Sequence, residues 1–399
     1  MNSNLAKLFS IGQKKHRRII GLMSGTSLDG LDVALCTISG AGRETEIVLD
    51  QFETISYADS FKNNIRQVFA KSTIDFEFLC TLNASIGSIH GQIILDCLHK
   101  WHIQPEEIDL IASHGQTVYH APKKQHDRPD MPNATLQIGD GDHIAVKTGI
   151  ITISDFRQKH IAAGGEGAPL AAYGDYFLFS DKNENRILLN IGGIANFTFL
   201  PRSGDSSHVF TMDTGPGNTL LDYYSQKHYG LAFDKNGEIA ASGQINRILL
   251  EQLKSHAYFK LSPPKTTGPE VFNHALVSES QQKCGQTALS HEDLLATLTR
   301  FSAETIADAI LKATVGYDEE FVIYTSGGGA HNPLLIRYLQ EKLPAYPIEN
   351  IQKLGVNGDA KEAILFALLA NETVAGVPQG SEKHTETPKI CMGKISFPQ

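Results

Sequence analysis

A short polar loop near the start of the chain contains residue types that bind phosphate groups. The apolar residues 19–23 are followed by Ser24, Gly25, Thr26, Ser27, Leu28, Asp29 and Gly30. Because the unpaired N–H groups of such a turn form a concave positive surface, the loop could bind the phosphates of a nucleotide. Asp29 and Asp32 stand beside it, where carboxylates can hold Mg²⁺ directly or through its waters. Taken alone, the same composition is also typical of an ordinary β-turn.

Three further glycine-rich loops follow apolar segments that predict buried strands. They are NIGGIAN with Gly192 and Gly193, DTGPGN starting at Asp213, and SGGGAHN with Gly327, Gly328, Gly329 and Asn332. In α/β proteins, phosphates bind to loops and helix N-termini at the carboxyl ends of strands. Each loop is weak support by itself. Together they predict a nucleotide-binding cleft of the type found in actin, sugar kinases and heat-shock ATPases.

Asp213 is the carboxylate best suited to act as a general base. It ends a predicted strand and has no Lys or Arg near it in the sequence that would form a local ion pair. The alternative is a carboxylate that only stabilises the N-terminus of the following helix.

Two other strand ends carry polar side chains that could contact a substrate. His114 and Thr117 follow the apolar residues 108–112, and Asp155 and Arg157 follow residues 149–154. Arg157 could bind a substrate carboxylate or form a structural pair with Asp155. A metal at His114 and His120 is possible, but a hydrogen-bonded histidine is the commoner case. Glu166 and Glu362 are weaker substrate-contact candidates, because exposed glutamates are common.

Several familiar catalytic motifs are absent from the sequence. No GxxxxGK followed by Ser or Thr occurs, and Asn332 replaces the third glycine of GxGxxG. Asp29 replaces the second glycine of the esterase motif GxSxG, and there is no HExxH. The nucleotide hypothesis therefore rests on the four loops.

The elements that position these loops fall into two similar halves. Residues 19–38 predict a hairpin, residues 79–101 a long amphipathic helix, and residues 187–200 repeat the plan of the first hairpin. This indicates an internal duplication in an α/β protein. We expect an N-terminal extension over residues 1–18, a first domain over 19–182, and a second domain over 183–399 that includes the C-terminal helix and tail.

Composition limits the possible partners. The 399 residues are 41% hydrophobic and 20% charged, with a net charge of −9, which is unfavourable for a nucleic-acid or anionic-membrane surface. The five cysteines include no CxxC pair, as expected in a reducing compartment. No secretory signal or run of about 20 apolar residues is found, so the cytoplasm is the expected location.

The motifs also resemble those of a known family. In order they are GLMSGTSLDG, SHGQT, IGDG, DFR, GGEGAPL, NIGGIAN, DTGPGN, FDKNGEIAASG and SGGGAHNP. Their order over about residues 19–370 is similar to that of the anhydro-N-acetylmuramic acid kinases of bacterial cell-wall recycling. The resemblance implies two duplicated actin-like, ribonuclease H-like domains with an ATP cleft between them, a homodimer, and the use of ATP and Mg²⁺. The implied reaction converts 1,6-anhydro-N-acetylmuramic acid and water into N-acetylmuramic acid 6-phosphate.

The resemblance also implies roles for individual residues. ATP would be bound by Gly25, Thr26, Ser27, Leu28, Asp29, Gly30, Leu31 and Asp32, with Gly192, Gly193, Gly327, Gly328, Gly329 and Asn332 further along the nucleotide. Asp29 and Asp32 would hold Mg²⁺, and Asp213 would be the base. The substrate would be bound by Ser24, His114, Thr117, Asp155, Arg157, Glu166 and Glu362, with Arg157 on the lactyl carboxylate. Glu166 departs from the family motif, which commonly has Gln there.

Two other functions remain open from the sequence. A levoglucosan-type kinase would share the fold but would not need a cation for a substrate carboxylate. A non-catalytic actin-like ATP-binding protein would have no use for a base at Asp213.

Overall fold

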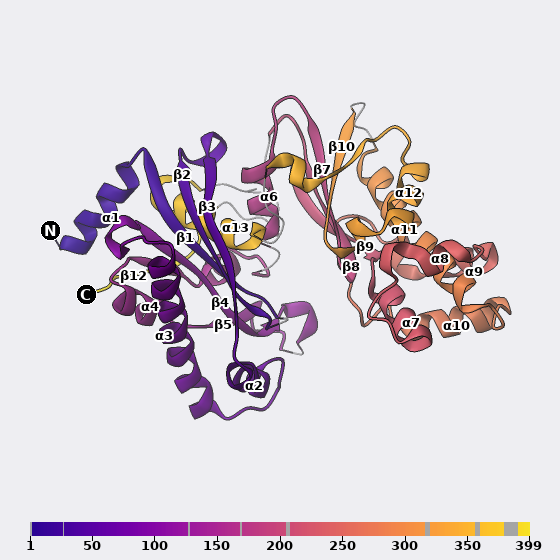
Figure 1. The fold of residues 1–399 in the computed structure, drawn as a ribbon, viewed down its shortest axis with the longest axis horizontal. Coiled ribbons are helices and arrows are strands. Elements are labelled where there is room, and N and C mark those ends of the chain that lie inside the picture. The colour runs from indigo at the N-terminus through magenta and orange to yellow at the C-terminus, as the bar shows by residue number, and fades with distance from the viewer. Residues whose placement is uncertain are drawn as a thin grey trace. The chain divides into compact units, whose positions relative to one another are not determined.

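The computed structural model describes residues 2–26, 28–126, 128–167, 170–204, 208–315, 320–355, 360–378 and 390–399. The chain forms two compact units. The first consists of Met1–Leu178 together with Asp359–Gln399, and the second of Phe179–Gly358. Each unit is built around one β-sheet (Figure 1).

The sheet of the first unit begins with three antiparallel strands. These are β1 (His16–Ser24), β2 (Gly30–Ser39) and β3 (Glu46–Ser56). β4 (Leu110–Ala121) then pairs in parallel with β1, and β6 (Thr152–Ser154) in parallel with β4. The short strands β5 (Ala134–Ile138) and β12 (Lys394–Ser396) pair with β4 and β6. The predicted hairpin is confirmed, and its strands are almost wholly buried because helices α13 (Lys361–Ala375) and α3 (Phe76–Lys100) pack on them.

The second unit repeats this topology. Its antiparallel strands are β7 (Asn185–Ile191), β8 (Ile194–Leu200) and β9 (Phe210–Pro216). β10 (Phe321–Ser326) pairs in parallel with β7, and β11 (Ile348–Asn350) in parallel with β10. The spatial order β11-β10-β7-β8-β9 matches β6-β4-β1-β2-β3 of the first unit, with the same strand directions. The predicted α/β fold with two duplicated actin-like domains is therefore confirmed.

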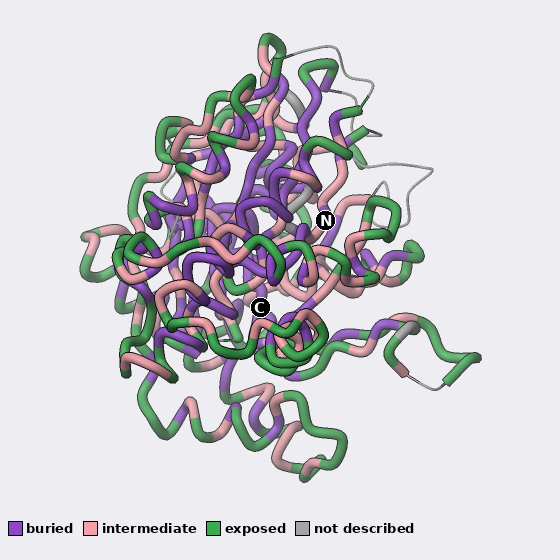
Figure 2. Tube along the Cα trace, turned by 90° about the vertical axis from the view of Figure 1, so that its right-hand side faces the viewer, coloured by how far each residue is buried: buried purple, intermediate pink, exposed green. Residues whose placement is uncertain are grey.

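Helices pack against both sheets. Those of the first unit are α1 (Ser3–Gln13), α2 (Asp59–Val68), α3 (Phe76–Lys100), α4 (Gly141–Thr148), α5 (Phe156–Ala162), α6 (Ala171–Phe179) and α13 (Lys361–Ala375). Those of the second are α7 (Thr219–Tyr229), α8 (Glu238–Ser242), α9 (Arg247–Lys254), α10 (His274–Cys284), α11 (His291–Ala313) and α12 (Pro333–Lys342). Each unit has its own apolar core. Figure 2 shows the buried stretches toward the inside of the trace and exposed turns at its outside.

The long helix α3 confirms the prediction for residues 79–101. The side chain of Asp75 caps its N-terminus, and Leu82, Ile86 and Ile94 lie in the core of the first unit. Among the described residues, α3 alone is long and apolar enough to cross a membrane. Its buried residues pack in the core of the first unit.

The predicted domain ranges need a correction at both ends of the chain. α13 packs against β1 and β2 of the first unit, beside which it lies in Figure 1. A Cβ atom on Gly21 of β1 would lie 1.9 Å from the carbonyl oxygen of Ala363 in α13, so only glycine permits this approach. The assignment of residues 359–399 to the second domain is therefore wrong. Residues 1–18 are also no separate extension, because α1 contacts α13 and β1 starts at His16.

Candidate functional site

The loop between β1 and β2 is a tight turn. Leu28 adopts a left-handed conformation with a φ of 60°, and its N–H lies 3.4 Å from the carbonyl oxygen of Gly25. Thr26 and Asp29 are exposed, whereas the side chains of Leu28 and Leu31 are buried in the core. Only the backbone of these two leucines could contact a ligand. Ser27 lies outside the described residues.

Gly30 is required where the loop meets the neighbouring strand. A Cβ atom there would lie 2.5 Å from the carbonyl oxygen of Ile55 in β3. The N–H of Tyr57 also lies 3.4 Å from the carbonyl oxygen of Asp29. The end of the loop is thereby held against the segment that follows β3.

The carboxylate of Asp32 lies on β2, just beyond the loop. It accepts a hydrogen bond of 2.6 Å from the hydroxyl of Thr54. Within the described ranges no three His, Cys, Asp or Glu side chains converge to hold a metal ion. A Mg²⁺ ion at Asp29 and Asp32 stays a prediction, since this ion can be held by one or two carboxylates together with nucleotide phosphates and water.

Arg157 is held in place by two acceptors. Its Nε atom donates to Nε2 of His114 at 3.0 Å, and its Nη1 atom donates to the carbonyl oxygen of Gly167 at 2.7 Å. Burial and the neighbouring guanidinium lower the pKa of His114 to about 3, so the ring is neutral and can act as the acceptor. Neither the Nη2 atom nor the second N–H of Nη1 has a partner among the interactions of the described residues. This outer edge of the guanidinium could bind a carboxylate.

The possible structural pair between Asp155 and Arg157 is not formed. Asp155 instead forms an ion pair with Lys394 of β12. The strand order explains this, because β12 pairs antiparallel with β6 and places Lys394 opposite Ser154. The sequence could not show that the C-terminal strand returns to this edge.

Glu362 lies close to Arg157, at the start of α13. Although part of the side chain is exposed, the surrounding protein desolvates the carboxyl group and raises its pKa. The charges of Arg157 and Lys361 oppose this shift, and that of Asp32 adds to it. The structure therefore brings together four predicted residues of the first unit, Asp32, His114, Arg157 and Glu362.

Thr117 and Glu166 lie near this group in the chain. Thr117 is three residues beyond His114 on β4, and its hydroxyl accepts a hydrogen bond of 3.1 Å from Gln137. Glu166 precedes Gly167, whose carbonyl oxygen accepts from Arg157. Their contact with a substrate stays a prediction.

The three glycine-rich loops of the second unit converge on one place. The N–H groups of Gly217 and Asn218 donate to the carbonyl oxygens of Gly193 and Gly192, both at 2.8 Å. On the other side, a Cβ atom on Gly327 would lie 2.7 Å from the carbonyl oxygen of Ile191. The glycines allow backbone segments from three strand ends to touch, as the prediction required.

Gly328 and Gly329 continue this contact, and Asn332 ends it. A Cβ atom on Gly328 would come no closer than 3.6 Å to its nearest neighbour, Asn218, whereas one on Gly329 would overlap Ile191 at 2.2 Å. The Oδ1 atom of Asn332 accepts from the N–H groups of Leu334 and Leu335, both at 3.1 Å. Asn332 thus caps α12 and fixes the end of the loop.

Asp213 is held by the loop over residues 263–273, which the sequence predicts as a loop without indicating this contact. Its N–H donates to the carbonyl oxygen of Lys265 at 2.9 Å, and its carbonyl oxygen accepts from the hydroxyl of Tyr258 at 2.7 Å. The N–H of Thr267 donates to Oδ2 of the carboxylate at 2.8 Å. Asp213 belongs to β9, and Asn218 is the N-cap of α7, so the alternative role in stabilising the helix N-terminus does not apply. A single oriented carboxylate is what a general base requires.

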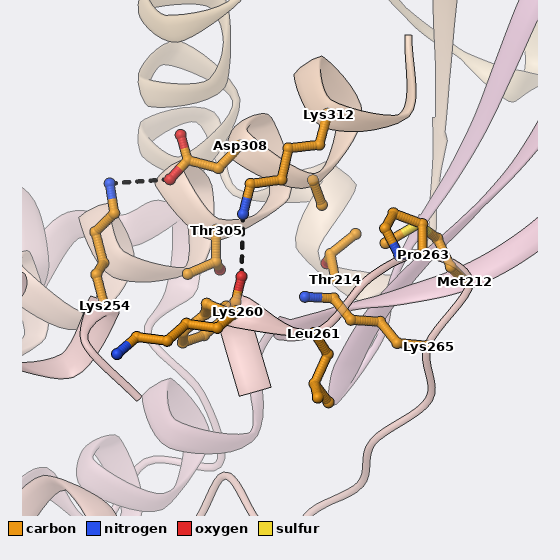
Figure 3. Close-up of a pocket in the computed structure, with 12 residues that line it drawn as sticks. Met212, Thr214, Lys254, Lys260, Leu261, Pro263, Lys265, Thr305, Asp308 and Lys312 are labelled. Carbon is orange, nitrogen blue, oxygen red and sulfur yellow. Dashed lines mark hydrogen bonds and ion pairs between the residues drawn. The ribbon is translucent and has the colours of Figure 1, made fainter. Parts of the chain in front are cut away.

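A pocket of about 260 Å³ lies behind the strand that carries Asp213 (Figure 3). Met212 and Thr214 line it, whereas Asp213 is not among its lining residues. The ammonium groups of Lys265 and Lys312 point into this pocket (Figure 3). They donate to the carbonyl oxygens of Tyr258 and Phe259, respectively, both at 3.0 Å. Burial, and then the charge of Lys312, lower the pKa of Lys265. The two lysines therefore stabilise the backbone at Tyr258 and Phe259. The hydroxyl of Tyr258 in turn donates to the carbonyl oxygen of Asp213.

Comparison with known proteins gives a match along nearly the whole chain. A family model described as anhydro-N-acetylmuramic acid kinase matches residues 17–398. Proteins of that name from Pseudoalteromonas atlantica and Pseudoalteromonas translucida are 54% and 52% identical, and each alignment covers 100% of both chains. A third, from Caldanaerobacter subterraneus, is 38% identical and covers 98% of this chain and 100% of its own. The matched range includes both units and every loop described above.

Proposed function

The chain belongs to the anhydro-N-acetylmuramic acid kinase family, and from this we infer that it is a phosphotransferase acting on 1,6-anhydro-N-acetylmuramic acid. It opens the anhydro ring with water and phosphorylates O6, giving N-acetylmuramic acid 6-phosphate for the recycling of cell-wall material. The full-length match carries this conclusion. The convergent glycine loops and the oriented Asp213 supply the chemistry that such a reaction needs.

Asp213 takes a proton from the attacking water. The water oxygen forms a bond to the anomeric carbon while the bond between that carbon and O6 breaks. The freed O6 then attacks the γ-phosphorus of ATP, and ADP leaves. The hydrogen bond from Thr267 to Oδ2 supports this role, because it fixes the direction of the carboxylate.

The loop from Ser24 to Gly30 binds the phosphates of ATP in this proposal. Its exposed Thr26 and Asp29 and the nearby Asp32 are the residues that face an anion and its cation. Asp29 and Asp32 would hold Mg²⁺, which neutralises charge on the phosphates when bound. The loops around Gly192, Gly193 and Gly327–Gly329 would contact the remainder of the nucleotide.

Arg157 binds the lactyl carboxylate of the sugar through the outer edge of its guanidinium. His114 and the carbonyl oxygen of Gly167 already orient the other edge. Burial lowers the pKa of Arg157 to about 10, which still leaves it charged at neutral pH. Thr117, Glu166 and Glu362 belong to the same proposed sugar site.

We further propose that the protein acts as a homodimer in the cytoplasm, as the family resemblance implies. The net charge of −9 and the lack of a CxxC pair are compatible with that location. Light scattering coupled to size-exclusion chromatography tests the dimer, and a mass of one chain would contradict it.

The activity is tested by incubating the purified chain with ATP, Mg²⁺ and either 1,6-anhydro-N-acetylmuramic acid or levoglucosan. Mass spectrometry should detect a sugar phosphate with the first substrate at a rate at least tenfold above that with the second. Equal or faster turnover of levoglucosan would favour the levoglucosan-type kinase. Nucleotide binding without turnover of either sugar would favour the non-catalytic role.

A further inference from the structure

A chain of buried polar side chains lies beneath the loop from Ser24 to Gly30. His90 belongs to α3, Tyr57 follows β3, Ser24 ends β1, and Gln116 lies on β4. Their exposed fractions are 0%, 6%, 1% and 0%. Buried polar groups are costly unless they are paired, so four of them in one place call for an explanation.

The hydrogen bonds of these four side chains run in one direction. The hydroxyl of Ser24 donates to Oε1 of Gln116 at 2.5 Å, and the hydroxyl of Tyr57 donates to Oγ of Ser24 at 2.8 Å. The tyrosine oxygen lies 3.0 Å from Nε2 of His90. Because the tyrosine proton is already used, His90 must be the donor in this last contact. Burial lowers the pKa of His90 to about 4, which is consistent with a neutral ring protonated on Nε2.

The far end of the chain reaches the loop backbone. The Nε2 atom of Gln116 donates to the carbonyl oxygens of Gly25 and Thr117, both at 3.3 Å. Only the amide nitrogen can donate to two carbonyls, so Oε1 of Gln116 must face Ser24. The chain therefore joins helix α3 to the first glycine of the loop.

A β-bulge aims Gln116 at this position. Leu22 of β1 pairs with Ser113, but Ser24 pairs with Gln116, so β4 contains one extra residue in this interval. Gly115 lies in the bulge with a φ of 74°, and a Cβ atom there would lie 2.6 Å from the carbonyl oxygen of Ile138. Bulges of this kind often redirect a side chain next to a functional site.

We propose that this chain holds the Ser24–Gly30 loop in the conformation that binds the phosphates of ATP, which makes Tyr57, His90 and Gln116 positioning residues for phosphoryl transfer. The proposal rests on the proposed function only in taking the bound phosphates to be those of ATP. It also corrects the prediction for Ser24. The hydroxyl of Ser24 is buried and committed to Gln116, so Ser24 supports the loop instead of binding the sugar.

The test compares Tyr57→Phe and Gln116→Met with the wild-type protein. Calorimetry gives the dissociation constant of a non-hydrolysable ATP analogue with Mg²⁺, steady-state kinetics give KM for the anhydrosugar, and thermal unfolding gives the melting temperature. We expect the dissociation constant of the analogue to rise about tenfold, as for the loss of one or two buried hydrogen bonds. For Tyr57→Phe, KM for the anhydrosugar should stay within about twofold of wild type, since this change acts on the nucleotide loop. Tyr338→Phe in α12 is the matched control, and its dissociation constant should be unchanged.

A double variant tests whether the chain acts as a unit. Ser24→Ala removes both hydrogen bonds of the serine hydroxyl, so adding Tyr57→Phe should weaken analogue binding no further. Two independent effects that multiply would overturn the proposal. It would also be overturned if Tyr57→Phe and Gln116→Met lower the melting temperature but leave analogue binding within twofold, or if the wild type binds no analogue. Binding of the analogue does not require turnover. A wild-type protein that binds the analogue but has no activity would therefore contradict the proposed function, and the comparison of the variants would still test this proposal.

Discussion

The guanidinium of Arg157 shows how single contacts prepare a binding group. His114 and Gly167 hold one edge, and the neutral state of His114 follows from its burial. An arginine oriented in advance loses less freedom when it binds a carboxylate. The contribution of Arg157 to substrate affinity should then depend on whether the substrate carries a carboxylate.

Arg157→Ala should raise KM for 1,6-anhydro-N-acetylmuramic acid about 10- to 100-fold, the range expected for a hydrogen bond to a charged group. Turnover of levoglucosan, which has no carboxylate, should change by less than about threefold. Steady-state kinetics with both sugars measure this, with the exposed Arg337→Ala as control. An equal loss with both sugars would show that Arg157 acts through structure alone.

The buried histidines predict how the stability of the first unit depends on pH. Burial lowers the pKa of His90 to about 4, and burial together with Arg157 lowers that of His114 to about 3. Both pKa values lie below the ordinary value of about 6.5, so the unfolded chain binds more protons between these limits. The stabilisation is complete above about pH 6.5 and is lost as the pH falls toward 4.

Denaturant unfolding at pH 7.0 and pH 5.0 should therefore show a loss of about 2 kcal/mol for each of the two histidines, because the slope reaches about 1.4 kcal/mol per pH unit only below about pH 6.5. The free energy of unfolding of the His90→Gln variant should fall less between the two pH values, because one of the two histidines no longer contributes. An unchanged difference would contradict the account of His90.

At the residue scale, the sequence revealed groups whose neighbours are local. Asp213 and the glycine loops were found because strand end, turn and helix follow one another in the chain. The hydrogen bond between Ser24 and Gln116 was not predicted, because the two residues are 92 apart in the chain. The clamp on Asp213 was missed for the same reason, since Thr267 is 54 residues from it.

At the scale of elements, α11 is tied to its neighbours by one buried carboxylate. Glu304 is 3% exposed and contacts Lys254 of α9 at 2.6 Å, Arg300 of its own helix at 2.9 Å and Lys342 of α12 at 3.2 Å. Burial alone would raise the pKa of Glu304, but the hydrogen bonds from these cations outweigh it and lower the pKa to about 2.

Glu304→Gln should destabilise the second unit by about 3 kcal/mol or more, because it leaves three cations without their shared buried partner. Denaturant unfolding at neutral pH measures this, and Glu279→Gln, in the exposed pair with Lys283, should change stability by less than about 1 kcal/mol. A loss at Glu304 no larger than at Glu279 would show that the cluster adds little.

Hairpins and the long helix α3 could be predicted from the sequence because their patterns are periodic and local. The bulge at Gly115 and the docking of α13 could not. A glycine inside a strand has several possible causes, and a nearly all-apolar helix such as α13 does not specify which sheet covers it.

At the scale of the whole molecule, the duplication was visible as a repeated hairpin plan and is confirmed by the matching strand order of the two sheets. The segment from Asp359 to Gln399 was placed in the wrong half, since chain order alone suggests that a duplicated domain ends where the chain ends. The ATP cleft between the domains stays a prediction, which the nucleotide-binding measurements above address.

The central claim is that Asp213 activates water to open the anhydro ring and that O6 then receives the phosphoryl group. The most direct measurement incubates the chain with ATP, Mg²⁺ and 1,6-anhydro-N-acetylmuramic acid in ¹⁸O-labelled water and analyses the early product by mass spectrometry. The account predicts a 6-phosphate with one ¹⁸O at the anomeric oxygen, and no product from Asp213→Asn although that variant still binds ATP. An unlabelled sugar phosphate, or full turnover by Asp213→Asn, would contradict it.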